Sequence, residues 1–134
     1  MPAPSFLAAS LYVALGGGLG AWLRYASGVA MFRSLGPATQ FPWATLSVNL
    51  LGSLAMGLLA GWLARHGSGA GETWRLLVGV GLLGGFTTFS AFSLEMMLLI
   101  ERGQAGTAFV YAAISVLAAV TALYIGLIAM RLAA

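Results

Sequence analysis

Four long apolar segments, separated by short polar stretches, make up most of the chain. Charge-free windows of about 20 residues lie at 5–23, 43–64, 76–94 and 103–130, and the third continues past Glu95 to residue 100. A membrane-spanning helix needs about 20 apolar residues to cross roughly 30 Å of hydrocarbon. The polar stretches between the windows are short: 33–41, 65–74 and 101–103. The pattern predicts a single all-α membrane domain over residues 1–134, with four transmembrane helices.

Composition supports this prediction and excludes most classes of soluble protein. Apolar residues make up 60% of the chain, charged residues make up 7%, and the mean hydropathy is +0.97. A soluble domain contains about 25% charged residues, so these few charges could not cover a water-exposed surface. The chain has no cysteine and therefore no disulfide framework. Its dispersed basic residues do not form a nucleic-acid surface, and its start lacks the basic region of a secretory signal.

The six arginines divide evenly between the two sides that four spans define. Three lie on the side of the termini: Arg65, Arg75 and Arg131. Three lie on the other side: Arg24, Arg33 and Arg102. Because cytoplasmic loops normally carry an excess of basic residues, parity favours insertion in both orientations and assembly as a dual-topology antiparallel homodimer. A single orientation set by other insertion signals is the alternative. Two glycine pairs, Gly16 with Gly20 and Gly57 with Gly61, have the close-approach spacing of candidate dimer faces.

The middle of the third segment consists of weak helix formers. Gly84 and Gly85 each weaken a helix by about 0.8–1.0 kcal/mol relative to Ala. Thr87 and Thr88 follow, and their hydroxyls can bond to nearby backbone carbonyls. A break at this depth would free carbonyls that need protein, water or an ion around them, and broken membrane helices often bind cations. The sequence favours a break in the third helix over its alternative, a continuous helix whose glycines allow close packing.

Neutral polar residues form narrow stripes on otherwise apolar segments. They recur at helical spacing on the second and fourth segments: Thr45 and Asn49, then Thr107, Tyr111 and Ser115. Phe89, Phe92 and Glu95 share one face of the third segment beyond its weak point. Cation and proton routes usually contain acidic or His side chains, whereas hydroxyl and amide donors and the partly positive edges of aromatic rings suit an anion. These residues predict a narrow path for a small anion whose identity they leave open.

Three stretches resemble the motifs of the Fluc fluoride channels, also called CrcB proteins. They are GGLGAWLRY at 17–25, WATLSVNLLG at 43–52 and GLLGGFTTFSAFSLE at 81–95. Ala91 is a small departure, since many members carry Thr there. The resemblance implies a dual-topology antiparallel homodimer with two pores, placed as a multi-pass protein in the cell (inner) membrane. It also implies passive export of fluoride, which lowers fluoride toxicity in the cytoplasm.

The resemblance further implies roles for particular residues. The implied fluoride pathway contains Asn49, Phe89, Phe92, Tyr111 and Ser115. The two Phe ring edges would be fluoride ligands and the other three side chains hydrogen-bond donors. The backbone carbonyls of Gly84 and Thr87 from both subunits would hold a structural sodium ion at the dimer centre. Arg24 matches a basic residue near the pore mouth, or serves as an anchor at the end of its span, and Glu95 matches an acid near the opposite vestibule. The implied partners are fluoride, a second copy of the chain and membrane lipid, without nucleic acid.

Two other functions compete with a fluoride channel. A small four-span cation or drug antiporter can also have dual topology, but its chemistry needs a deep acid, typically in the first span, and the first segment has none. A non-transporting anchor subunit that binds haem needs axial His or Met ligands, and the lone His66 falls in an expected loop. The spans contain no GxSxG, no HExxH and no paired carboxylates, so we do not expect an enzyme.

Overall fold

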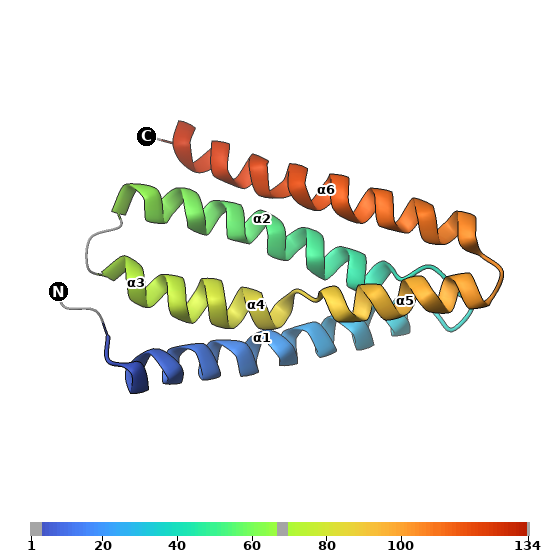
Figure 1. The fold of residues 1–134 in the computed structure, drawn as a ribbon, viewed down its shortest axis with the longest axis horizontal. Helices are drawn as coiled ribbons and strands as arrows, with labels where there is room; N and C mark the ends of the chain where they lie inside the picture. Colours follow the sequence, from blue (N-terminus) through green and yellow to red (C-terminus); the bar gives the residue numbers. More distant parts are fainter. Residues whose placement is uncertain (1–3, 67–69, 134) are drawn as a thin grey trace.

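The computed structural model describes residues 4–66 and 70–133, which form four long helical rods lying side by side (Figure 1). The first two rods are α1 (Phe6–Leu35) and α2 (Trp43–His66). The third comprises α3 (Ala70–Trp74), η1 (Arg75–Leu83), α4 (Gly84–Phe86) and α5 (Phe89–Glu101), and the fourth is α6 (Ala105–Leu132). In the described residues, four helices are long and apolar enough to cross a membrane. The prediction of an all-α protein with four spans is confirmed.

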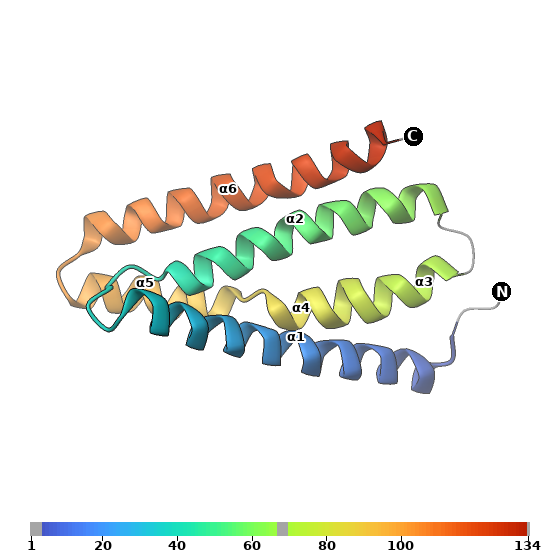
Figure 2. The same ribbon diagram turned by 180° about the vertical axis from the view of Figure 1, so that it is seen from behind.

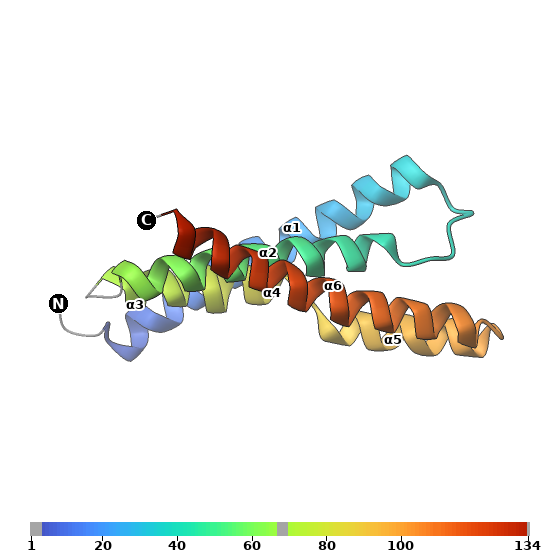
Figure 3. The ribbon, with the colours of Figure 1, turned by 90° about the horizontal axis from the view of Figure 1, so that it is seen from above.

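The rods run up and down, so that the start of α1 and the end of α6 lie at the same end of the bundle (Figure 2). Neighbouring rods pack as α1 against η1 and α4, α2 against α6, and α5 against α6. Seen from above, the last turns of α1 diverge from the α5–α6 pair (Figure 3). At that end, Gln104 Nε2 donates a hydrogen bond to Gln40 Oε1 and links the two connections between rods.

The helices are longer than the charge-free windows predicted. α1 begins after Ser5, whose hydroxyl accepts a hydrogen bond from the Ala8 amide at 3.3 Å, and it continues through two arginines to Leu35. The loop predicted over 33–41 is therefore wrong for its first three residues. The loop predicted over 65–74 is wrong for residues 65–66, which end α2, and for residues 70–74, which form α3. A charged side chain limits how deep a helix lies in hydrocarbon, but it does not end the helix. α1 ends instead at Gly36, whose φ of 75° favours glycine.

Glycines bring the rods into backbone contact. A Cβ built on Gly57 would lie 2.0 Å from the carbonyl oxygen of Leu123 in α6, and one on Gly20 would lie 2.0 Å from that of Leu82 in η1. The other glycine of each pair is also buried against its own chain. Both pairs that were candidate dimer faces therefore serve packing within the subunit.

The third rod changes its backbone conformation along its length. η1 is a π-helical stretch, a form that is rare in proteins and frequent at functional sites. α4 ends at Phe86, and α5 begins at Phe89. Between them Thr87 (φ −82°, ψ 157°) and Thr88 (φ −153°, ψ 126°) have extended backbone. This extended segment is visible between α4 and α5 near the middle of the third rod (Figure 1).

We expect Gly57→Ala to lower the thermal stability of the purified protein. The new Cβ overlaps the Leu123 carbonyl, so α2 and α6 must move apart, and overpacking of this kind typically costs about 1–3 kcal/mol. Gly18→Ala is the matched control, because nothing lies within 4 Å of a Cβ built there. Thermal unfolding in detergent checks the prediction, and an equal Tm for the two variants would contradict it.

Candidate functional site

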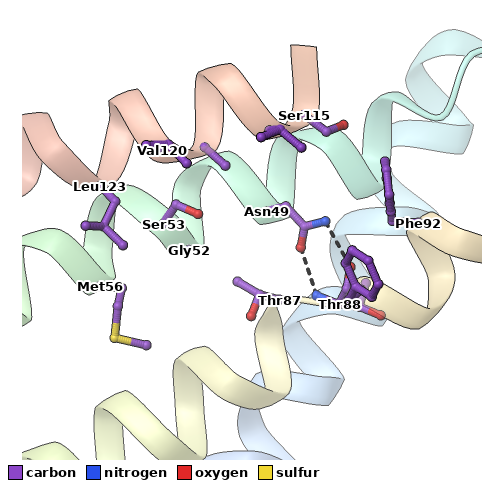
Figure 4. Close-up of a pocket in the computed structure, with 13 residues that line it drawn as sticks. Asn49, Gly52, Ser53, Met56, Thr87, Thr88, Phe92, Ser115, Val120 and Leu123 are labelled. Carbon is purple, nitrogen blue, oxygen red and sulfur yellow. Dashed lines mark hydrogen bonds between the residues drawn. The ribbon is translucent and has the colours of Figure 1, made fainter. Parts of the chain in front are cut away.

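The extended segment of the third rod is held by a side chain from α2. Asn49 Nδ2 donates to the carbonyl oxygen of Thr88 at 3.0 Å, and the Thr88 amide donates to Asn49 Oδ1 at 2.8 Å (Figure 4). The carboxamide thus pairs with both backbone groups of one residue, in place of helical neighbours. The resemblance implied that Asn49 is a donor along the pathway. One of its two N–H groups is used in this contact with the backbone.

Carbonyls beside this contact, among them those of Gly84 and Thr87, lack the partners that a continuous helix would provide. In an α-helix the Thr88 amide would donate to the Gly84 oxygen, and the Ala91 amide to the Thr87 oxygen. Here the Thr88 amide donates to Asn49, and the Ala91 amide donates to Thr88 Oγ1 at 3.2 Å. Side-chain oxygens therefore divert both donors away from the carbonyls of Gly84 and Thr87.

Arg24 lies against the end of α4. Its Nε donates to the carbonyl oxygen of Gly85 at 3.2 Å. It is partly buried, whereas the other five arginines are exposed. α1 continues beyond Arg24 to Leu35, so Arg24 does not lie at the end of its helix. The structure places this guanidinium inside the bundle, beside the middle of the third span.

Glu95 joins three helices through hydroxyl groups. Its Oε1 accepts from Thr45 Oγ1 at 2.6 Å, and its Oε2 accepts from the Tyr111 hydroxyl at 2.7 Å. Thr45 is 8% exposed and Tyr111 is 0% exposed, so these bonds to a carboxylate are partly shielded from solvent, which strengthens them. Thr45 belongs to the polar stripe predicted on the second segment, one turn before Asn49, although the resemblance implied no role for it.

A pocket of about 400 Å³ opens between α2, the extended segment and α6 (Figure 4). Four of the five residues predicted for the pathway line it: Asn49, Phe89, Phe92 and Ser115. The Ser115 hydroxyl is buried and has no hydrogen-bond partner among the described residues. Leaving a buried polar group unpaired typically costs about 1–3 kcal/mol. Ser115 is therefore a lining residue with an unpaired hydroxyl hydrogen.

Aromatic rings connect this pocket to the buried tyrosine. The ring centroids of Phe89 and Phe92 are 5.5 Å apart, and those of Phe92 and Tyr111 are 5.0 Å apart. Phe89 is 78% exposed in the single subunit. The edge of an aromatic ring carries partial positive charge, so edges together with a free hydroxyl can contact an anion without fixed charges. Tyr111 lies behind Phe92, and its own hydroxyl is occupied by Glu95.

The fold defines a multi-pass membrane protein, and comparison with known proteins identifies its family. Residues 11–127 match the family described as CrcB-like protein, Camphor Resistance (CrcB). The chain is 57% identical over 125 residues to the fluoride-specific ion channel FluC of Novosphingobium aromaticivorans, covering 93% of this chain and 98% of that one. It is 56% identical over 128 residues to FluC of Erythrobacter litoralis, covering 94% of each chain.

FluC of Caulobacter vibrioides is 50% identical over 121 residues, covering 90% of this chain and 94% of the relative. The chain therefore belongs to the CrcB family, and the resemblance found in its motifs is confirmed. The relatives are named as ion channels rather than enzymes. In bacteria such a multi-pass protein lies in the inner membrane.

We expect Asn49→Ala to destabilise the protein and to impair its transport. The substitution removes both partners of Thr88, and each backbone group left unpaired costs about 1–3 kcal/mol. Ser47→Ala, two residues away on α2 and without a hydrogen bond to the third rod among those the structure describes, is the control. Thermal unfolding and fluoride efflux from liposomes measure the two effects. Wild-type behaviour of Asn49→Ala in both assays would contradict the assigned contact.

Proposed function

We propose that this chain is a fluoride-selective channel that lets fluoride leave the cell passively and so lowers fluoride toxicity in the cytoplasm. The observation that carries the proposal is membership of the CrcB family, with relatives named fluoride-specific ion channels that match over almost their whole length. The pocket supports it, because its lining combines uncharged hydrogen-bond donors with aromatic rings. Donors of this kind can replace part of the hydration shell of a small anion.

The two alternative functions find less support in the structure. α1 carries no acidic residue, whereas a cation or drug antiporter needs a deep acid there. His66 lies exposed in the last turn of α2, where its ring stacks on Trp62 with centroids 5.0 Å apart. That position is at the end of the bundle rather than between helices, where an axial haem ligand would lie. A fluoride channel therefore remains the function that the site supports best.

In the proposed pathway, fluoride contacts the free hydroxyl of Ser115 and the ring edges of Phe89 and Phe92. The second N–H of Asn49 is a further donor on the same pocket wall. Tyr111 completes the aromatic row and is oriented by its hydrogen bond to Glu95. The path thus passes beside the extended segment of the third rod, where the backbone supplies oriented dipoles.

The functional unit in this proposal is an antiparallel homodimer surrounded by lipid. The largely exposed ring of Phe89 and the open pocket beside it leave part of the pathway uncovered in one subunit. With Arg24 inside the bundle, the two ends of the subunit carry three and two arginines, which is still close to parity. Near parity supports insertion in both orientations, and a second copy in the opposite orientation would cover this face.

A structural sodium ion fits the backbone at the same place. The residues that would hold it are Gly84 and Thr87 of both subunits, because their carbonyls lack helical amide partners. Carbonyl oxygens are suitable ligands for a hard monovalent cation, and freed carbonyls of broken helices commonly bind such ions. When bound, the ion would supply a fixed positive charge beside the pathway.

We expect Phe89→Ile and Phe92→Ile each to reduce fluoride efflux by about threefold to tenfold, the scale of one aromatic contact. Isoleucine keeps an apolar side chain but lacks the positive ring edge. Phe109→Ile is the matched control, because Phe109 is exposed on α6 and does not line the pocket. A fluoride electrode follows efflux from loaded liposomes, with chloride as the reference ion, and size-exclusion chromatography verifies assembly. Undiminished fluoride efflux in both pathway variants would exclude the ring-edge mechanism.

Replacing sodium by a bulky organic cation during purification should weaken the assembly. A ligand that binds only the folded state stabilises it by about 2.7 kcal/mol at 100 times its Kd, so Tm should rise with sodium concentration. N-methylglucamine chloride at equal ionic strength is the control for general salt effects. A Tm that is the same in both salts would contradict the sodium site. The fluoride pathway is tested separately, by the phenylalanine variants.

A further inference from the structure

Arg24 is partly buried without a carboxylate partner in the described part of the chain. The ion pair found there joins Arg75 to Glu72 near the end of the bundle. Arg24 instead donates a hydrogen bond from Nε to the backbone carbonyl of Gly85. A guanidinium inside a membrane bundle needs a polar partner, and here the partner belongs to the interrupted span.

α1 holds the end of α4 at close range on the same side. A Cβ on Gly85 would lie 2.5 Å from the carbonyl oxygen of Gly17, and one on Gly20 would lie 2.8 Å from the Phe86 amide. Arg24 follows Gly20 by four residues, so both face the third rod from one side of α1. The arginine therefore extends a backbone-to-backbone contact by one further turn, up to the last carbonyls of α4.

The Gly85 carbonyl needs such a partner because α4 ends immediately after it. In a continuous α-helix its donor would be the amide of Phe89, but Phe89 starts α5 beyond two extended residues. Arg24 Nε supplies the missing donor. The carbonyls of Gly84 and Thr87 also lose their helical donors, which bond instead to Asn49 and to the Thr88 hydroxyl. Arg24 does not replace the donors of these two carbonyls.

We propose that Arg24 is a positioning residue for the cation site of the third span. By pairing with Gly85, it withdraws that carbonyl from the set available to a cation and fixes the end of α4, where the carbonyls of Gly84 and Thr87 are presented. This proposal rests on the sodium site of the proposed function.

The test compares Arg24→Gln and Arg24→Lys with Arg33→Gln in the full-length protein. Arg33 lies on the same helix but is exposed, so Arg33→Gln makes the same charge change away from the third rod. Two readouts are needed: the sodium concentration at half-maximal thermal stabilisation, and the hydrogen-exchange rates of the Thr87 and Thr88 amides. Fluoride efflux from liposomes is recorded alongside them.

We expect both Arg24 variants to need about fivefold more sodium and to exchange these amides about fivefold faster, the scale of one lost hydrogen bond. Arg33→Gln should match the wild type in both. Lysine keeps the charge but has no N–H at the Nε position. Full recovery of both readouts in Arg24→Lys would therefore overturn positioning and leave a role for charge alone. Wild-type values in Arg24→Gln would overturn the proposal altogether.

Two further outcomes remain decisive. If the wild type shows no sodium dependence, the sodium site of the proposed function fails. The test of Arg24 then depends only on hydrogen exchange of the Thr87 and Thr88 amides. Exchange rates that are unchanged in Arg24→Gln would overturn its contact with Gly85. If Arg24→Gln does not assemble in moderate sodium, it is purified in increasing sodium chloride with N-methylglucamine chloride as the control. Assembly that recovers only in sodium supports the proposal, and assembly that recovers in neither salt overturns it.

Discussion

The structure depends on keeping extended backbone satisfied in the middle of a membrane-spanning rod. Each unpaired backbone group in hydrocarbon costs several kcal/mol, so an interruption at Thr87 and Thr88 needs partners from elsewhere. Asn49 on α2 pairs with both groups of Thr88, and Arg24 on α1 pairs with Gly85. The interrupted rod is therefore stable only when α1 and α2 are packed against it, and local conformation here is a product of tertiary assembly.

Close packing by glycine makes those side-chain contacts possible. α1 approaches the third rod so closely that a Cβ on Gly20 would overlap the backbone of η1. At that distance the arginine one turn later reaches a carbonyl with Nε. Glycine spacing that can bring two membrane proteins together is used here inside one chain. The outward surfaces are left to large apolar side chains, many of them exposed in the single subunit, as lipid contact allows.

Hydropathy predicted the four spans because the thickness of the hydrocarbon sets the length of each apolar segment. It did not predict where helices end, since Arg24 and Arg33 lie within α1 and the helix ends at a glycine with positive φ. Helix propensity located the weak stretch at 84–88. It could not show which carbonyls lose their donors, because that depends on side chains from two other rods.

The polar stripes and the aromatic face of the third segment contain the four pathway residues that line one pocket. The hydrogen bond of the fifth residue, Tyr111, could not be derived from spacing. Glu95 takes the hydroxyl hydrogens of Thr45 and Tyr111. A hydroxyl has one hydrogen to donate, so Tyr111 cannot donate to an anion while it is bonded to the carboxylate. Ser115, one turn further along α6, has no such partner among the described residues. Because the Glu95 carboxylate occupies the Tyr111 hydroxyl, the donors available to an anion in the proposed pathway lie on the pocket side of Phe92. An anion that bonds to Ser115 and to the ring edges therefore stays away from the negative charge of Glu95.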